Sequence, residues 1–174
     1  MIAHTKGLFK VFDASIYTIG NDFTTAEIDV WIDPASISTN EAKRDAHLRS
    51  ADFFDVENHK QITFTSSTMG QPDEDGLQEL WGELTMKGIT KNVKLFVEFG
   101  GIIHDPWGNE KAGFTITGKI NKTDWDLNWN TMLDAGNIMI SEDVNIFCEV
   151  ELIKTPQGKL PLELESLTVD KTTL

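Results

Sequence analysis

The chain has 174 residues and a formal net charge of −13 at pH 7, from 28 acidic and 15 basic side chains. This length fits one domain that can bury a sizeable core without a metal or a disulfide. The acidic surplus repels phosphate backbones and anionic lipid surfaces at long range, so nucleic acid and anionic membranes are disfavoured as partners.

The sequence offers neither a membrane span nor an export signal. No apolar run approaches the roughly 20 residues that cross a bilayer. The N-terminus lacks the basic-then-apolar layout of a signal peptide. The chain as written is therefore expected to be soluble and to remain in the cytoplasm.

Two strands are predicted near the N-terminus. Residues 6–12 have the composition of a strand. After a turn at residues 20–22, residues 26–33 alternate small or aliphatic side chains with acidic ones or tryptophan, which is typical of a strand with one buried face. Pro34 ends this strand because it cannot donate a ladder hydrogen bond.

A short helix and a packed loop are predicted next. Residues 38–50 favour a helix, with Thr39 or Asn40 as the expected N-cap and Glu41 in the first turn. Residues 50–55 place two adjacent aromatic side chains between carboxylates, which neither the helical nor the strand period explains, so they are predicted to be a packed loop.

The most regular stretch predicts a β-hairpin, which follows a strand over residues 61–69. Residues 80–86 and 93–99 alternate strictly and are separated by a glycine-containing break at residues 87–90. One face of the hairpin is apolar and the other is mostly polar. Because side chains repeat every second residue, a one-residue slip would turn the apolar set outward, so the register is tightly specified.

Two long strands complete the pattern. Period-two alternation predicts strands over residues 112–120 and 144–152. The second contains Cys148, the only cysteine, which is expected to be a buried structural thiol. Between the strands, residues 121–130 suit a polar rim or edge segment. Its apolar side chains are Trp125, Leu127 and Trp129.

These elements predict an all-β fold with one short helix. About seven strands with turn signals every ten or so residues favour a closed antiparallel barrel or a sandwich. Closure is preferred because long alternating strands with open edges invite aggregation. A barrel of about eight strands is wide enough for one small ligand or for its own side chains.

Five segments in order resemble the YceI-like family, the bacterial polyisoprenoid-binding proteins. They are RDAHLRSADFFD (44–55), QITFTSS (61–67), GELTMKGITKNVKL (82–95), GKINKTDWDLNWN (118–130) and SEDVNIFCEVEL (141–152). The resemblance implies a lipocalin-like antiparallel β-barrel with the helix near its mouth. It also implies an apolar lumen that takes a long isoprenoid tail without catalysis. Family members occur as exported periplasmic proteins and as leaderless ones.

Two departures from the family pattern concern the ends of the chain. The family's usual first strand is absent, so the barrel domain is expected to span residues 1–154, with a C-terminal extension over residues 155–174. The first and last strands of an antiparallel barrel are neighbours. Residues 162–169 are therefore predicted to fill the missing strand's place, in their own barrel or by strand exchange in a homodimer. A frayed tail is the alternative.

A lumen that binds an isoprenoid lipid or similar long-chain amphiphile needs aliphatic and aromatic lining, because burial of the tail supplies about 25 cal/mol per Å². The candidate ligand-binding residues are Ile28, Val30, Phe64, Leu84, Met86, Leu95, Val97, Phe99, Phe114, Ile116, Val144 and Ile146. An ordinary packed core is the alternative. Gly82 and Gly118 on the same parity favour a cavity, although glycine also marks barrel bends.

Arg44 and His47 are the candidate contacts for a polar head group at the barrel mouth. Arg44 would act as a fork donor and His47 as a second donor to a diphosphate or quinone. Alternatively, Arg44 and Asp45 tie the helix and residues 52–55 onto the barrel, and this structural role is the preferred one for Asp45.

No metal, cofactor or catalytic site is predicted. The histidines lack ligand spacing and only one cysteine is present. A nucleophile elbow and a phosphate-binding glycine loop are both missing. The leading hypothesis is a non-enzymatic carrier of a polyprenyl or isoprenoid-quinone type molecule. The alternative is a stress-related structural or interaction protein with a self-filled barrel, whose Trp31, Trp81 and Trp107 contact partners.

Overall fold

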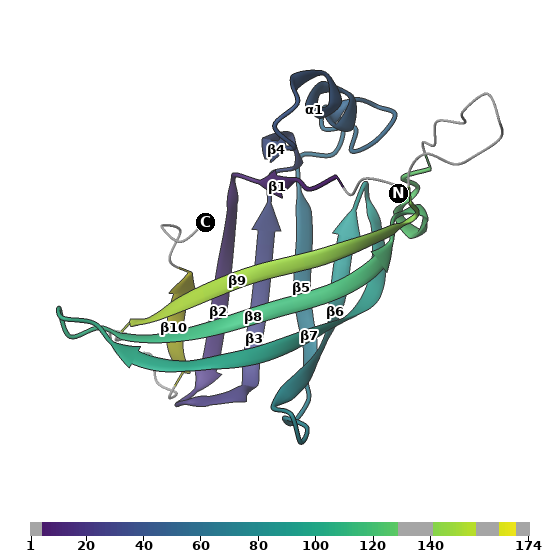
Figure 1. Cartoon of the computed structure of the whole chain (residues 1–174). Helices are drawn as coiled ribbons and strands as arrows, with labels where there is room; N and C mark the ends of the chain where they lie inside the picture. Colours follow the sequence, from purple (N-terminus) through teal and green to yellow (C-terminus); the bar gives the residue numbers. More distant parts are fainter. Residues whose placement is uncertain (1–4, 129–140, 156–163, 170–174) are drawn as a thin grey trace.

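Alternating strands close into a barrel in the structure, a computed structural model that describes residues 5–128, 141–155 and the backbone of 164–169. The antiparallel order is β10-β2-β3-β5-β6-β7-β8-β9. The barrel strands are β2 (Phe12–Ile19), β3 (Asp22–Ile32), β5 (Ile62–Met69), β6 (Leu77–Met86), β7 (Ile89–His104), β8 (Glu110–Asn121), β9 (Asp143–Thr155) and β10 (Leu164–Val169). In Figure 1, β7, β8 and β9 cross in front of β2, β3, β5 and β6. The predicted antiparallel barrel is confirmed.

The predicted hairpin is formed by β6 and β7. Lys87 and Gly88 at its turn have φ of 48° and 74°, and positive φ at both central positions is what a type I′ turn requires. The turn is thus shorter than the predicted break. Leu80 pairs with Leu95 across the ladder, and the lumen-facing side chains of β6 are buried from Gln78 onward.

The first barrel strand lies later in the chain than predicted. Within residues 6–12, Leu8–Phe9 form β1, which pairs with β4 (Ile37–Ser38) outside the barrel, and only Phe12 belongs to the barrel. The barrel strand is β2, in which Ile16 and Thr18 are buried. The prediction was wrong because a hydroxyl side chain takes one of the buried positions of β2 and weakens the apolar alternation.

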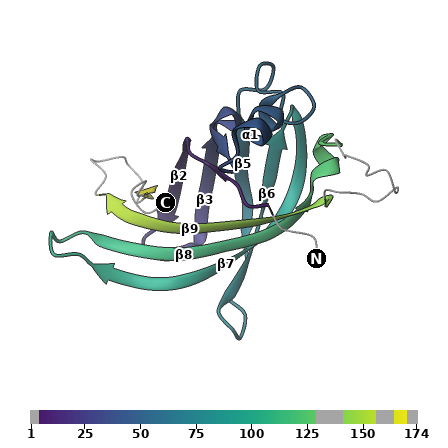
Figure 2. The ribbon, with the colours of Figure 1, turned by 45° about the horizontal axis from the view of Figure 1, so that its top comes forward.

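The predicted helix is α1 (Ala42–Arg49), and it lies at one end of the barrel (Figures 1 and 2). Glu41, rather than Thr39 or Asn40, is the N-cap, because its carboxylate accepts hydrogen bonds from the backbone N–H groups of the first turn. The 3-10 turn η1 (Pro34–Ser36) precedes β4. In the predicted packed loop after α1, Phe53 is buried in the main apolar cluster.

Residues 122–127 plug the α1 end of the barrel. They begin with the 3-10 helix η2 (Lys122–Trp125). Trp125 is 1% exposed and donates its indole N–H to the Leu84 carbonyl at 3.0 Å, and Leu127 is also buried. The segment was predicted to be a polar rim or edge segment. It does lie at the end of the barrel, but a tight turn there buries the side chains of Trp125 and Leu127. Trp129 lies outside the described residues.

β10 lies between β9 and β2. Leu167 of β10 pairs with Lys154 of β9 and with Ile16 of β2, antiparallel to both. The three strands belong to the same chain. The predicted turn at residues 156–158 and the start of the predicted last strand at residue 162 lie outside the described residues.

Candidate functional site in the barrel lumen

One wall of the lumen is closely packed. The buried apolar side chains of β5, β6 and β7 between residues 62 and 97, here called the filled wall, belong to one cluster in which Leu80 is 1% and Val97 2% exposed. The predicted lining residues in this cluster are Phe64, Leu84, Met86, Leu95 and Val97. The predicted lining residues that are half-buried and pack against it are Ile28, Val30, Phe114, Ile116 and Ile146.

Gly82 and Gly118 leave no space in the lumen. A Cβ at Gly82 would meet the Phe64 ring and would lie 2.6 Å from the Thr65 carbonyl oxygen, and a Cβ at Gly118 would meet the Leu95 side chain. Neighbouring side chains thus occupy the volume that the glycines free. The prediction that these glycines enlarge a cavity was wrong, because they instead let Phe64 and Leu95 pack closely.

The lumen-facing side chains of β9 are less covered. Val144, Ile146 and Cys148, here called the open wall, alternate toward the lumen on the same parity as Leu152, which is 3% exposed. Val144 is 40% exposed and Cys148 is also exposed. A lumen-facing side chain stays this exposed only where no other side chain covers it. The lumen is therefore open beside this part of β9.

Cys148 is not the buried structural thiol that was predicted. It pairs with Ile116 across the β8–β9 ladder and is exposed. The surrounding barrel nevertheless desolvates the sulfur and raises the pKa of the Cys148 thiol. The thiol is thus accessible but weakly nucleophilic at neutral pH. The sequence indicates that Cys148 lies on the open wall, because it falls at every second position together with Val144 and Ile146.

An aromatic cluster narrows the lumen away from α1. The ring centroids of Phe23, Phe99 and Phe114 lie 4.9 to 5.6 Å apart. Phe99, a predicted lining residue, is 41% exposed despite these contacts. Phe23 of β3 was not predicted, because residues 22–25 show no alternation. Ile16 and Leu152 form a second small buried cluster beside it.

Arg44 and His47 both contact residues between 39 and 53. Arg44 donates from Nε to the Thr39 hydroxyl at 2.7 Å and from Nη2 to the Thr39 carbonyl at 3.0 Å. His47 Nε2 lies 3.1 Å from a carboxylate oxygen of Asp52, and its ring packs edge-on against Phe53. Both residues predicted to bind the head group thus lie on α1. Their hydrogen bonds connect the helix to the loops on either side of it.

Two further charged residues hold this end together. Asp45 accepts hydrogen bonds from the Thr39 hydroxyl and backbone N–H, and these bonds lower the pKa of Asp45. Arg49, which sequence reasoning missed, donates to the carbonyls of Ala35 and Ile37, both at 2.8 Å. Arg49 had no motif that distinguished it from other exposed helix cations. Together these bonds fix η1, β4 and α1 to one another.

A buried lysine also lies at the α1 end. Lys122 is 3% exposed, and its Nζ lies 5.6 Å from the centroid of the Phe53 ring. Burial lowers the pKa of Lys122, while the charge of Glu142 opposes this shift. The sequence gives no signal that Lys122 is buried, because it lies in the segment predicted to be a polar rim or edge. Its ammonium group places positive charge at this end of the barrel, over the Phe53 ring.

Metal sites and membrane-spanning helices were also sought among the residues that the structure describes. Over residues 5–128 and 141–155, no three His, Cys, Asp or Glu side chains are grouped so that they could hold a metal ion. No helix among the described residues has the length and apolar character needed to cross a bilayer.

Known proteins share the sequence pattern and the barrel. Residues 1–152 match the YceI-like domain. A UPF0312 protein of Staphylococcus aureus strain MSSA476 is 34% identical over 152 residues, which cover 87% of this chain and 85% of that protein. The crystal structure of the Campylobacter jejuni YceI protein has a TM-score of 0.78 at 30% identity, covering 90% of this chain and 88% of that one. Burkholderia cenocepacia BcnA shares the fold, with a TM-score of 0.72 at 21% identity over 87% and 89% of the two chains.

Proposed function

This chain belongs to the YceI-like family, and from that premise we propose that it binds a long-chain isoprenoid-type amphiphile, such as a polyprenyl or isoprenoid quinone, in its barrel lumen without catalysing a reaction. The observation that carries the proposal is the open wall. Val144 faces the lumen and is 40% exposed, and a hydrocarbon chain would remove this apolar surface from water.

The mechanism of binding is burial of the tail. Lumen-facing positions of β9 from Val144 to Val150 span about 20 Å, at roughly 3.3 Å per residue. A tail that buries about 400 Å² gains roughly 10 kcal/mol at about 25 cal/mol per Å². Part of this gain offsets the lost motional freedom of the ligand. This is enough for tight binding without any reactive group.

The two walls would have different roles in binding. The filled wall supplies a rigid backing, because its side chains already pack against one another. Val144, Ile146 and Ile116 contact the tail from β9 and β8, and Phe99 and Phe114 meet its far end. The polar head lies at the α1 end, where Arg44, His47 and the buried Lys122 supply donors and positive charge.

Native mass spectrometry after gentle purification, followed by organic extraction, tests the proposal. We expect a non-covalent lipid adduct in the natural protein. Ile146→Glu places a charge on the open wall and should abolish the adduct, since burial of an unpaired carboxylate is costly. Phe147→Glu is the matched control, because Phe147 is the next residue on β9 and is 65% exposed on the outer face. Absence of an adduct, or equal retention in both variants, would contradict lumen binding.

The filled wall favours one other function. If side chains filled the whole lumen, the protein would serve as a structural or interaction protein whose contacts are made from outside. Trp31 and Trp81 are 38% and 37% exposed on the outer face of the barrel, as such a role requires. Purified protein that carries no lipid and binds none on addition would favour this alternative.

A further inference from the structure

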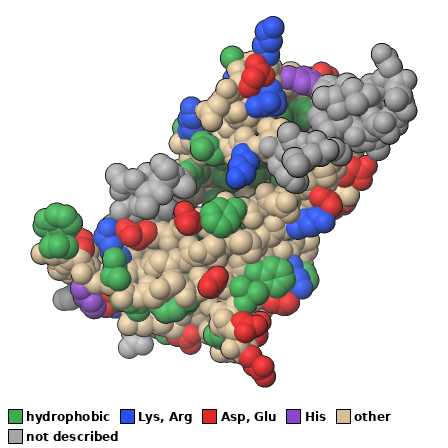
Figure 3. Space-filling view, in the orientation of Figure 1, with side chains coloured by type: hydrophobic (Ala, Val, Ile, Leu, Met, Phe, Trp, Pro, Cys, Tyr) green, Lys and Arg blue, Asp and Glu red, His purple; other side chains and the backbone are tan. Residues whose placement is uncertain are grey.

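The β7–β8 hairpin extends past the rest of the barrel (Figures 1 and 2). Three large apolar side chains near its end are exposed. Ile102, Ile103 and Trp107, here called the tip cluster, are 40%, 60% and 84% exposed. Trp107 is more than twice as exposed as Trp81 on the barrel wall. The space-filling view shows hydrophobic side chains gathered at this projecting end (Figure 3).

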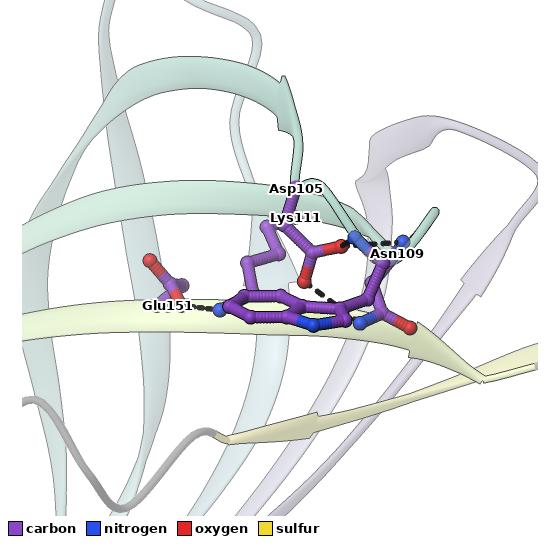
Figure 4. A network of polar contacts seen from close by, with 5 residues as sticks. Asp105, Asn109, Lys111 and Glu151 are labelled. Atoms are coloured by element: carbon purple, nitrogen blue, oxygen red, sulfur yellow. Dashed lines mark hydrogen bonds and ion pairs between the residues drawn. The ribbon is translucent and has the colours of Figure 1, made fainter.

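Hydrogen bonds to one carboxylate hold the turn that carries Trp107. Asp105 accepts hydrogen bonds from the backbone N–H groups of Trp107 and Asn109, both at 2.9 Å, and from the Asn109 side-chain amide at 2.7 Å (Figure 4). These bonds lower the pKa of Asp105, so its carboxylate stays ionised and bonded. A pre-ordered turn loses little conformational entropy when its tip binds.

Charges around the tip cluster are paired. Lys111 Nζ lies 2.6 Å from a Glu151 carboxylate oxygen (Figure 4). Glu110 lies 3.3 Å from His104 Nε2 and 3.7 Å from Lys154 Nζ. Asp105, Glu110 and Glu151 against Lys111 and Lys154 leave the tip a formal charge of −1 with His104 neutral, in a protein whose overall charge is −13. Such a tip can approach an uncharged surface without a large electrostatic or desolvation cost.

We propose that the tip cluster inserts into the interfacial layer of a zwitterionic lipid bilayer and holds the barrel at the membrane surface. Tryptophan suits this layer because its ring is apolar while its N–H remains hydrogen-bonded. Ile102 and Ile103 are successive residues of β7 and point to opposite faces of the hairpin, so the apolar area on any one face is smaller than the roughly 300–600 Å² of the largest patch on a typical monomer. This is below the about 800 Å² per partner of a stable protein interface, so a bilayer fits the patch better than a second protein.

Flotation with phosphatidylcholine vesicles tests this docking. The natural protein should float with the vesicles, and Trp107→Ser should lower the partition coefficient by about tenfold or more. Ile103→Ser should lower it less. Trp81→Ser is the matched control and should change the coefficient by less than about twofold. Thermal unfolding followed by circular dichroism verifies that each variant is folded.

Several outcomes would overturn the docking. They are the absence of flotation with phosphatidylcholine, binding only when anionic lipid is added, and equal flotation of the Trp107→Ser variant. A dimer in analytical ultracentrifugation that disappears in Trp107→Ser would identify a second copy as the partner instead. The vesicles contain no isoprenoid, so a failed flotation leaves the test of lumen binding by mass spectrometry unaffected.

Discussion

Leu80 on the filled wall is 1% exposed, whereas Val144 on the open wall faces the same lumen and is 40% exposed. Both residues lie in strands with the same alternation of apolar and polar side chains. The difference comes from their neighbours, since Leu80 belongs to the main buried cluster, whereas Val144 lies at the start of β9 beside Ile120 and Ile146, which are themselves only half-buried. Alternation thus decides which way a side chain points, and tertiary packing decides whether it is covered.

The largest expected effect is a difference between the two walls in their contribution to the free energy of unfolding. Leu80→Ala removes a buried side chain from close packing and should lower the free energy of unfolding by about 2–5 kcal/mol. Val144→Ala removes a side chain that is already exposed and should cost less than about 1 kcal/mol. Urea unfolding of the ligand-free protein measures both. Equal losses would mean that the two walls do not differ.

A smaller loss of stability is expected from a test of whether Gly82 is needed for the close packing of the filled wall. Gly82→Ala would drive a methyl group into the Phe64 ring and toward the Thr65 carbonyl oxygen, with an expected loss of about 1–3 kcal/mol. Gly113→Ala on β8 is the control, because a Cβ there meets no atom within 4 Å. Its unfolding free energy should change by no more than about 0.5 kcal/mol. If Gly82→Ala were equally harmless, Phe64 could move aside and the wall would be loosely packed.

The strands with large apolar side chains at every second position could be predicted from sequence. Strands β6, β7, β8 and β9 have this pattern, and their lumen faces were assigned correctly for Leu84 and Val97. β2 was missed because Thr18 occupies a buried position there. The inward turn of Trp125 depends on its hydrogen bond to a carbonyl about forty residues earlier, and no local pattern encodes such a contact.

The sequence could predict which side chains of the candidate site face the lumen, but not how exposed they are. Parity placed Val144 and Ile146 in the lumen, and the same parity holds for Cys148. Their exposure could not be predicted, because it depends on which side chains of distant strands reach them. Gly82 shows the same limit: a missing side chain suggested space, but Phe64 from the neighbouring strand fills it.

Alkylation of Cys148 tests the open wall most directly, because this is the only thiol in the chain. Iodoacetamide should modify Cys148 slowly in the folded, ligand-free protein. The rate should rise with pH, and the midpoint of this rise should lie at a higher pH than for a free cysteine, because the pKa of the Cys148 thiol is raised. A saturating long-chain polyprenyl alcohol should slow the reaction about tenfold or more by covering the sulfur, as exclusion of the reagent requires. An unchanged rate with the alcohol, or no modification until the protein is unfolded, would contradict an open lumen that shelters an isoprenoid chain.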